Sequence, residues 1–155
     1  MLVSVQEADF DPGAEIVGLS AGDPDVGAVA SFVGLVRRGN VGAEVSAMTL
    51  EHYPGMTERA LHDIVTEASG RWQCDHVRVI HRFGRLCPGD RIVFVGVASR
   101  HRGDAFAACE FIMDYLKTRA PFWKREETPE GARWVDARES DDTAALRWGE
   151  LDLRR

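Results

Sequence analysis

The sequence predicts an α+β domain in which a mostly antiparallel sheet is packed against helices on one face. Short runs rich in Val, Ile and Phe alternate apolar with polar residues, which is typical of half-buried strands. Two longer segments, 56–72 and 105–116, instead repeat apolar residues every three or four positions, as amphipathic helices do. For 155 residues we expect one domain over 1–155, with a strand and helix within about 1–26 and a tail at 149–155.

The first part of the chain carries the signals of a short helix and a long strand. Asp11 has the side chain of a helix N-cap, Pro12 suits the first helical position, and Gly22 follows the end. A strand is predicted over 27–37, with Gly34 as a candidate bulge.

A second strand, 45–53, is expected to pair with the first as a hairpin. Pro54 and Gly55 then turn the chain into a helix. The buried stripe of this helix is predicted to consist of Met56, Ala60, Leu61, Ile64, Val65, Ala68 and Trp72.

The second half repeats this pattern. The segment 76–84 alternates as a half-buried strand, and 91–99 is so apolar that it should be the most buried strand. A helix follows and stops at Pro121, with a predicted stripe of Ala105, Phe106, Cys109, Ile112, Met113 and Leu116. Beyond it we expect a turn at 129–131, an extended piece at 133–137 and a short helix near 141–148.

Composition and charge exclude several classes of protein. The net charge is −6, yet 99–125 holds six Lys or Arg against three acids, which favours a small anionic ligand over nucleic acid. No apolar stretch is long enough to span a membrane, and the first residues resemble neither a signal nor a transit peptide. Three cysteines without CxxC spacing argue against disulfides and a thiolate metal site, and favour a reducing cytoplasm.

The stretch DYLKTRAPFWKRE, at 114–126, is the first candidate for a binding site. It gathers Lys117, Arg119, Lys124 and Arg125 around two aromatic residues that could exclude water and face a flat heterocycle. On a helical wheel Lys117 lies at the border of the apolar stripe. Its amine could therefore enter a crevice, or it could be an ordinary surface lysine with its methylenes on the core.

Further cations occur at predicted ends of elements. Residues 100–102, Arg-His-Arg, precede a helix whose first N–H groups can bind an anion, although they could instead pair with nearby carboxylates. Arg37 and Arg38 end the first long strand. The two charges could prevent another strand from pairing with a sheet edge. Alternatively, if this strand lies beside 91–99, Arg37 could reach the same crevice as residues 100–102.

Standard catalytic motifs are missing from the sequence. His52, His62, His76 and His81 are interpreted as structural, and no spacing indicates a metal hydrolase, a serine hydrolase or a nucleotide-binding loop. With these classes disfavoured, the remaining candidate is catalysis by lysine side chains. Neighbouring cations and burial lower the pKa of an amine, which can then act as acid, base, nucleophile or fixed charge.

Four stretches carry a resemblance to a known family: LEHYPGMTERAL, VIHRFGRLCPGDRIVFVGVASRHR, AFAACEFIMDYLKTRAPFWKRE and RWVDARESD. From about Gly27 to Trp148 the chain resembles the large, catalytic subunits of molybdopterin synthase. The resemblance implies an α/β hammerhead-like, dimeric fold and the conversion of cyclic pyranopterin monophosphate into molybdopterin. It implies no metal and no cofactor.

The same resemblance implies partners. Sulfur arrives as a thiocarboxylate on the C-terminal Gly-Gly of a small ubiquitin-like carrier subunit, and two carriers join a homodimer of large subunits in a heterotetramer. Neither nucleic acid nor a membrane takes part.

Site residues follow from the resemblance motif by motif. Lys117 and Lys124 match the catalytic lysines, and the substrate-binding residues are Arg37, His101, Arg102, Arg125 and Arg138. The resemblance allows Arg138 to act across a dimer interface, which would put each site at a subunit boundary. Arg100 departs from the pattern, since a small residue is expected there, and Cys87 and the tail GELDLRR are also unlike it.

Two other classes of function stay open from the residues alone. A non-catalytic phosphometabolite-binding or scaffold module could use the same basic pocket. A single-strand RNA binder could stack bases on Phe122 and Trp123, although the net acidity disfavours it.

Overall fold

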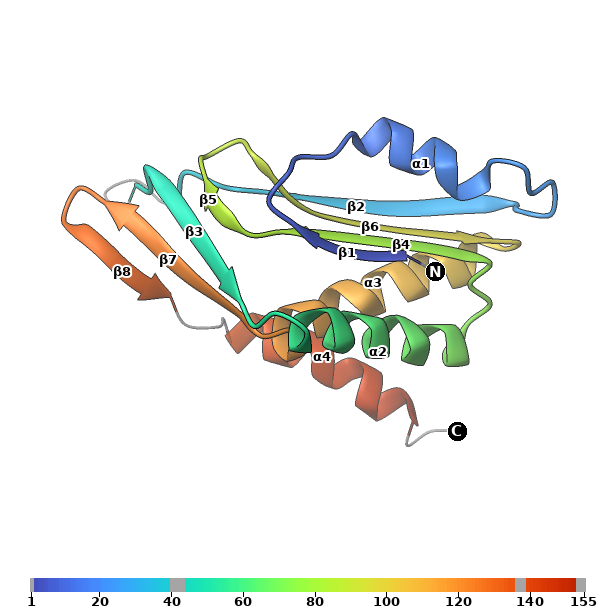
Figure 1. The fold of residues 1–155 in the computed structure, drawn as a ribbon. Helices are drawn as coiled ribbons and strands as arrows, with labels where there is room; N and C mark the ends of the chain where they lie inside the picture. Colours follow the sequence, from blue (N-terminus) through green and yellow to red (C-terminus); the bar gives the residue numbers. More distant parts are fainter. Residues whose placement is uncertain (1, 40–43, 136–138, 153–155) are drawn as a thin grey trace.

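The computed structural model describes residues 2–39, 44–135 and 139–152 (Figure 1). In chain order the elements are β1 (Leu2–Gln6), α1 (Pro12–Ser20), β2 (Ala28–Leu35), β3 (Ala47–His52), α2 (Met56–Arg71), β4 (His76–Arg82), β5 (Gly84–Leu86), β6 (Arg91–Ser99), α3 (Arg102–Arg119), β7 (Phe122–Thr128), β8 (Gly131–Val135) and α4 (Glu139–Asp152). No helix within these ranges is both long and apolar enough to cross a bilayer.

The strands form two four-stranded sheets. The first sheet has the order β1-β4-β6-β2 and the second the order β5-β3-β7-β8. Only β1 and β4 pair in parallel, and the other pairs within the described strands are antiparallel. The predicted α+β class with a mostly antiparallel sheet is therefore confirmed, with two sheets where the sequence suggested one.

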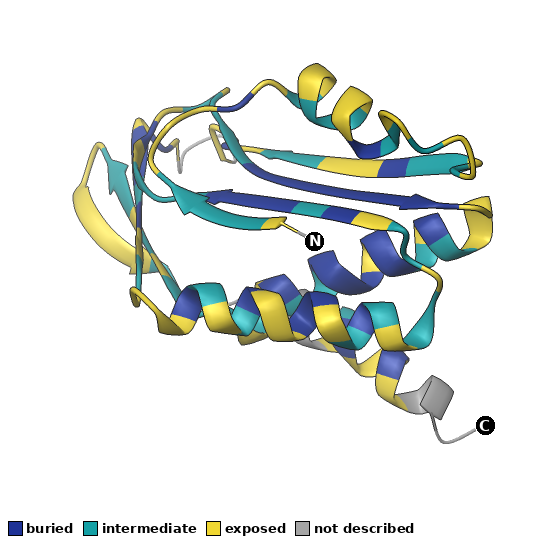
Figure 2. Cartoon of the chain, turned by 45° about the vertical axis from the view of Figure 1, so that its right-hand side comes forward, coloured by how far each residue is buried: buried dark blue, intermediate teal, exposed yellow. Residues whose placement is uncertain are grey.

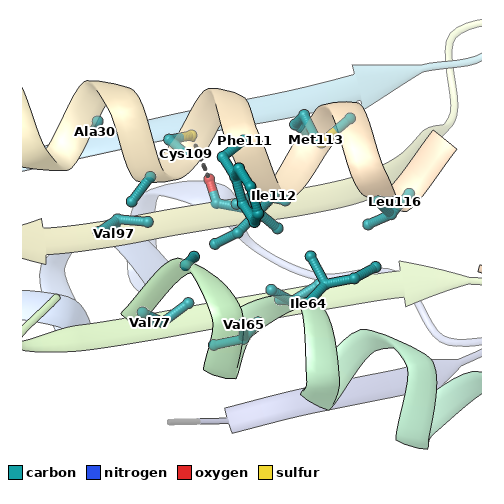
Figure 3. Packing of buried hydrophobic residues seen from close by; sticks show 14 of the residues in the cluster. Ala30, Ile64, Val65, Val77, Val97, Cys109, Phe111, Ile112, Met113 and Leu116 are labelled. Atoms are coloured by element: carbon teal, nitrogen blue, oxygen red, sulfur yellow. Dashed lines mark hydrogen bonds between the residues drawn. The ribbon is translucent and has the colours of Figure 1, made fainter. Parts of the chain in front are cut away.

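The long helices lie on one face of the first sheet, as predicted, while the short α1 lies on the opposite face (Figure 1). α2 and α3 pack beneath the sheet, and α4 packs against α3. β6 is buried almost from end to end, which confirms it as the most enclosed strand (Figure 2). Figure 3 shows the main core, where side chains of α2 and α3 meet those of β4 and β6.

The prediction that Phe106 belongs to the buried apolar stripe of α3 is wrong. Phe106 is 65% exposed, whereas Phe111, which the stripe omitted, is fully buried. Phe111 is buried because α4 and the end of α2 cover this side of α3: its ring lies 5.6 Å from that of Trp148 in α4 and 5.3 Å from that of Trp72, the C-cap residue of α2. A helix covered on two sides buries more than one stripe, and a single-stripe pattern cannot reveal the second neighbour.

Charge pairing holds the acidic N-terminal segment on the sheet. Asp9 accepts from Arg91 at 2.6 Å, Glu15 from Arg78 at 3.1 Å, and Asp23 lies 2.7 Å from His76. The hydrogen bond from Arg91 lowers the pKa of the Asp9 carboxyl below its usual value. Three of the six acidic residues in 1–36 are thus paired with basic residues of β4 and β6.

Two local predictions for α1 and β2 are confirmed. Asp11 caps α1, with Oδ1 accepting from the N–H groups of Gly13 at 3.0 Å and Ala14 at 3.3 Å. The register between β2 and β6 shifts between Gly34 and Leu35, at the expected bulge.

The predicted hairpin of 27–37 with 45–53 is wrong. β2 pairs with β6, while β3 pairs with β5 and β7 in the second sheet. Eleven residues separate Leu35 from Ala47, too many for a two-residue hairpin turn, so local sequence did not fix the pairing. The segment 122–128 was also missed as a strand, because β7 is polar on both faces and lacks the apolar alternation of a half-buried strand.

Candidate active site

A cavity of about 390 Å³ lies between the end of α3 and the second sheet. Three elements bring one cation each to its wall. Lys117 comes from the last turn of α3, Lys124 from β7 and Arg37 from the segment after β2. The apolar part of the wall is formed by Leu35, Val36, Val45, Met48, Leu50, Ile92, Leu116, Ala120, Phe122 and Val135.

The fold places the two lysines by a change of element between them. α3 ends at Arg119, and β7 begins at Phe122 after a short connection. Successive side chains of a strand point to opposite faces, so Phe122, Lys124 and Glu126 share the cavity face of β7. Arg125 projects from the other face and is not part of the wall.

Lys117 and Lys124 are the only lysines among the 19 basic Lys and Arg residues of the chain. A guanidinium keeps its proton in proteins, whereas a lysine amine can release and regain one when its surroundings lower its pKa. Both lysine side chains of the chain line one cavity. The scarcity of lysine is visible in the sequence alone.

His81 forms part of the cavity wall and was missed as a site residue. It is only 5% exposed, its ring stacks on Phe122 at a centroid distance of 3.8 Å, and Nδ1 lies 2.8 Å from the carbonyl oxygen of Arg82. Burial lowers its pKa to about 4, and the nearby charges of Lys117 and His52 act in the same direction. The ring is therefore neutral at pH 7.

The sequence offered only a faint signal for His81. Val77, Val79 and His81 alternate on the face of β4 that α2 and α3 cover, so the histidine continues a core face. The other three histidines were interpreted as structural, and two of them have structural contacts. His52 lies 3.2 Å from the Thr57 hydroxyl, and His76 pairs with Asp23.

Glu126 is the one carboxylate on the cavity wall within the described part of the chain. Its Oε2 accepts from the Arg133 guanidinium at 3.3 Å. The cavity therefore combines two amines, a guanidinium, a neutral imidazole and a paired carboxylate, a set that suits an anionic reactant and proton transfer.

A second hollow surrounds the start of α3. It is lined by Gly27 and residues 100–103. His101 occupies the N-cap position without making a side-chain cap, and the guanidinium of Arg100 lies 3.9 Å from Asp25. Arg100 thus adds its charge to this hollow and not to the lysine cavity.

The two hollows lie at opposite ends of one helix. Lys117 follows Arg102 by 15 positions in α3, which corresponds to about 22 Å along the axis. Because β2 runs antiparallel to β6, Arg37 lies at the Arg91 end of β6, away from Ser99. Within one chain the structure brings Arg37, Lys117 and Lys124 together and leaves His101 and Arg102 apart; Arg138 lies outside the described residues.

The part of the cavity wall that the structure describes contains no cysteine. Burial raises the pKa of the Cys109 thiol to about 12 and also raises that of Cys74, so both sulfurs are poor nucleophiles. In the portion of the chain described by the structure, no three His, Cys, Asp or Glu residues are grouped closely enough to hold a metal ion.

Comparisons with known proteins identify the family. The MoaE protein family model matches residues 5–119. A curated relative from Ralstonia nicotianae, named molybdopterin synthase catalytic subunit, is 65% identical over 147 residues, which cover 95% of this chain and 84% of the relative. The fold and the lysine cavity described above belong to a chain that is closely similar to this enzyme subunit.

Solved structures agree. The molybdopterin biosynthesis MoaE protein from Burkholderia ambifaria is 57% identical, with a TM-score of 0.81 over 95% of this chain and 97% of that one. A protein–protein complex of subunits 1 and 2 of molybdopterin-converting factor from Helicobacter pylori is 17% identical and has the same fold, with a TM-score of 0.72 over 88% and 91% of the two chains. The chain therefore belongs to the MoaE family, which includes the catalytic subunits of molybdopterin synthase.

Proposed function

We propose that the chain is the catalytic subunit of a molybdopterin synthase, a sulfurtransferase that converts cyclic pyranopterin monophosphate into molybdopterin. The sulfur donor is the thiocarboxylate of a small ubiquitin-like carrier subunit. The observation that carries the proposal is that the only two lysines of the chain line one cavity together with Arg37.

The chemistry of the cavity supports sulfur transfer. The thiocarboxylate sulfur attacks the side chain of the pterin, and the carrier acyl group is then hydrolysed. Both steps create or move negative charge, which Arg37 can stabilise as a fixed cation and the two amines as cations that also exchange protons. Lys117 is assigned to the carrier carbonyl and Lys124 to the second acid–base role.

A complete site in this proposal needs two copies of the chain. His101 and Arg102 would contact the phosphate and pterin from the second hollow of a neighbouring copy, with Arg138 acting across the same boundary. Support comes from β2, an edge strand of the first sheet on which Phe32 and Leu35 are 42% and 54% exposed. An uncovered strand edge with apolar side chains suits a subunit interface.

The carrier is the second partner. The relatives are named as catalytic subunits, and a chain of this fold is found in a complex of subunits 1 and 2 of molybdopterin-converting factor. We assign the chain to a heterotetramer of two large and two small subunits. Three unpaired cysteines suit work in the cytoplasm, where thiols stay reduced.

The first prediction concerns the two lysines. Lys117→Ala and Lys124→Ala should each lower molybdopterin formation from thiocarboxylated carrier and cyclic pterin by at least about 100-fold, since each removes a proton-transfer group. Circular dichroism and thermal unfolding should remain near those of the parent, because neither lysine is among the buried residues of the core. Product is measured as the dithiolene, by chromatography of its oxidised derivative.

Arg119→Ala is the matched control. Arg119 follows Lys117 by two residues but pairs with Glu67 at 2.6 Å and stacks on Tyr115, outside the cavity. Its loss should leave product formation nearly unchanged. Near-parental turnover in both lysine variants would remove the mechanism, and a parent chain that binds the pterin but forms no dithiolene would support the non-catalytic binding module instead.

A further inference from the structure

His81 has an unused hydrogen-bonding nitrogen at the cavity. A carbonyl oxygen can only accept, so the contact of Nδ1 with the Arg82 carbonyl at 2.8 Å places the ring proton on Nδ1. Nε2 then carries a lone pair, and no described residue donates to it. Among the described side chains that are not exposed, only Asp75 has an oxygen or nitrogen that is fully enclosed without a partner. Nε2 of His81 is therefore not fully enclosed, and the residue is part of the cavity wall.

Lys117 is the complementary group. Its amine lines the same cavity, and within the described ranges it makes neither a hydrogen bond nor an ion pair. Its charge is also close enough to act on the imidazole. The Lys117 ammonium is thus a hydrogen-bond donor that has no acceptor among the described residues, and Nε2 of His81 is an acceptor that has no donor among them.

We propose that His81 is a positioning residue for the proposed sulfur transfer. The Lys117 ammonium, which does not donate to His81 in the structure, turns to Nε2 during the reaction, and this hydrogen bond holds the amine at the reactants. The inference rests on the proposed function, because it assigns His81 a part in the same reaction. His81 acts through Lys117 and is not assigned a contact with substrate.

An imidazole suits this position better than a carboxylate would. A carboxylate would pair with the ammonium, raise the pKa of the amine and retain its proton. A neutral lone pair orients the amine without adding charge. The imidazole ring of His81 is held in place, since Nδ1 donates to a backbone carbonyl and one face of the ring stacks on Phe122. His52 is the other titratable group beside Phe122.

Two amide variants separate the two nitrogens. In His81→Asn the side-chain amide can still donate to the Arg82 carbonyl, as Nδ1 does, but nothing replaces Nε2. In His81→Gln the longer side chain can return an acceptor to the Nε2 position. We expect kcat of the Asn variant to fall roughly 10- to 100-fold, the loss of one hydrogen bond to a charged group, with little change in the KM for the pterin. The Gln variant should recover most of this loss.

A double-variant cycle tests whether His81 works through Lys117. Single-turnover rates are compared for the parent, His81→Asn, Lys117→Ala and the double variant, all in complex with thiocarboxylated carrier. If His81 only positions Lys117, the Asn substitution should cost nothing further once the amine is gone. Equal multiplicative losses in both backgrounds would overturn the inference, as would an Asn variant as fast as the parent.

These outcomes are distinct from failure of the proposed function. If the parent chain forms no dithiolene with its carrier, the sulfurtransferase assignment fails, whatever the variants do. If the parent is active and the Asn and Gln variants slow to the same extent, His81 has only a structural role. Thermal unfolding of both variants shows whether a slow variant is folded.

Discussion

At the scale of single residues, His81 makes the stability of the protein depend on pH. Its folded-state pKa is about 4, whereas an unperturbed histidine titrates near 6.5. Between these values the unfolded chain binds a proton that the folded chain does not. This stabilising contribution is therefore fully present above about pH 6.5 and is lost as the pH falls toward 4.

The second prediction measures this contribution by urea unfolding from pH 7.5 to pH 4. The parent should lose about 3 kcal/mol of unfolding free energy through His81 over this range, in addition to losses from other groups. His81→Gln does not titrate and serves as the reference, since Lys117, Lys124, Glu126, Arg37 and His52 around the ring are the same in both chains. A free-energy difference between parent and variant that stays constant with pH would contradict the assignment.

Individual residues also show what the sequence could and could not reveal. Lys117 and Lys124 were predicted because unusual local sequence surrounds them, and the cavity contains both. His81 was not, because a histidine that ends a core face looks the same whether the next space is filled or hollow. Only the tertiary structure, which ends the core and opens the cavity at this position, distinguishes the two cases.

At the scale of elements, α3 has a hollow at each of its ends. Its first turn lies beside the hollow of residues 100–103, and its last turn directs Lys117 to the cavity. Gly27 supports the first end by donating to the Ser99 carbonyl at 2.9 Å. A Cβ at this position would lie 2.2 Å from the Arg100 carbonyl oxygen, a backbone atom that must shift to make room.

The third prediction is that Gly27→Ala displaces residues 100–102. We expect a several-fold rise in the KM for the cyclic pterin, because His101 and Arg102 lose their placement, while single-turnover sulfur transfer at saturation changes less. Gly18→Ala in α1 is the matched control. A Cβ there meets nothing within 4 Å, and alanine should stabilise the helix by about 0.5–1 kcal/mol. If the two variants have the same KM for the cyclic pterin, Gly27 does not determine the position of residues 100–102.

Helices and strands were predictable from the sequence where one face is buried and the other is exposed to solvent. The apolar period located α2, β4, β6 and most of α3 to within a few residues. It failed for β7, whose charged residues face a cavity on one side and the surface on the other. It also failed for strand pairing, because the partner of β2 lies more than fifty residues away along the chain and nothing local specifies it.

At the scale of the whole molecule, the candidate site is divided. Residues that the sequence assigned to one crevice occupy two hollows separated by most of the length of α3. Sequence reasoning could not foresee the division, since it depends on β2 and β6 being antiparallel. In a two-fold symmetric dimer, the two hollows form one site if the cavity of one chain faces the second hollow of its partner.

The fourth prediction is that inactive chains complement each other in a mixed dimer. When Lys117→Ala is paired with His101→Ala, one site of the dimer carries both substitutions and the other carries neither. Random exchange should then restore about one quarter of the parental activity, since about half of the dimers are mixed and each has one intact site. Pairing Lys117→Ala with Lys124→Ala should restore nothing, because both lysines line the cavity of the same chain. Differently tagged chains and native mass spectrometry confirm exchange; mixed dimers that form but stay inactive in the first pairing would place the whole site within one chain.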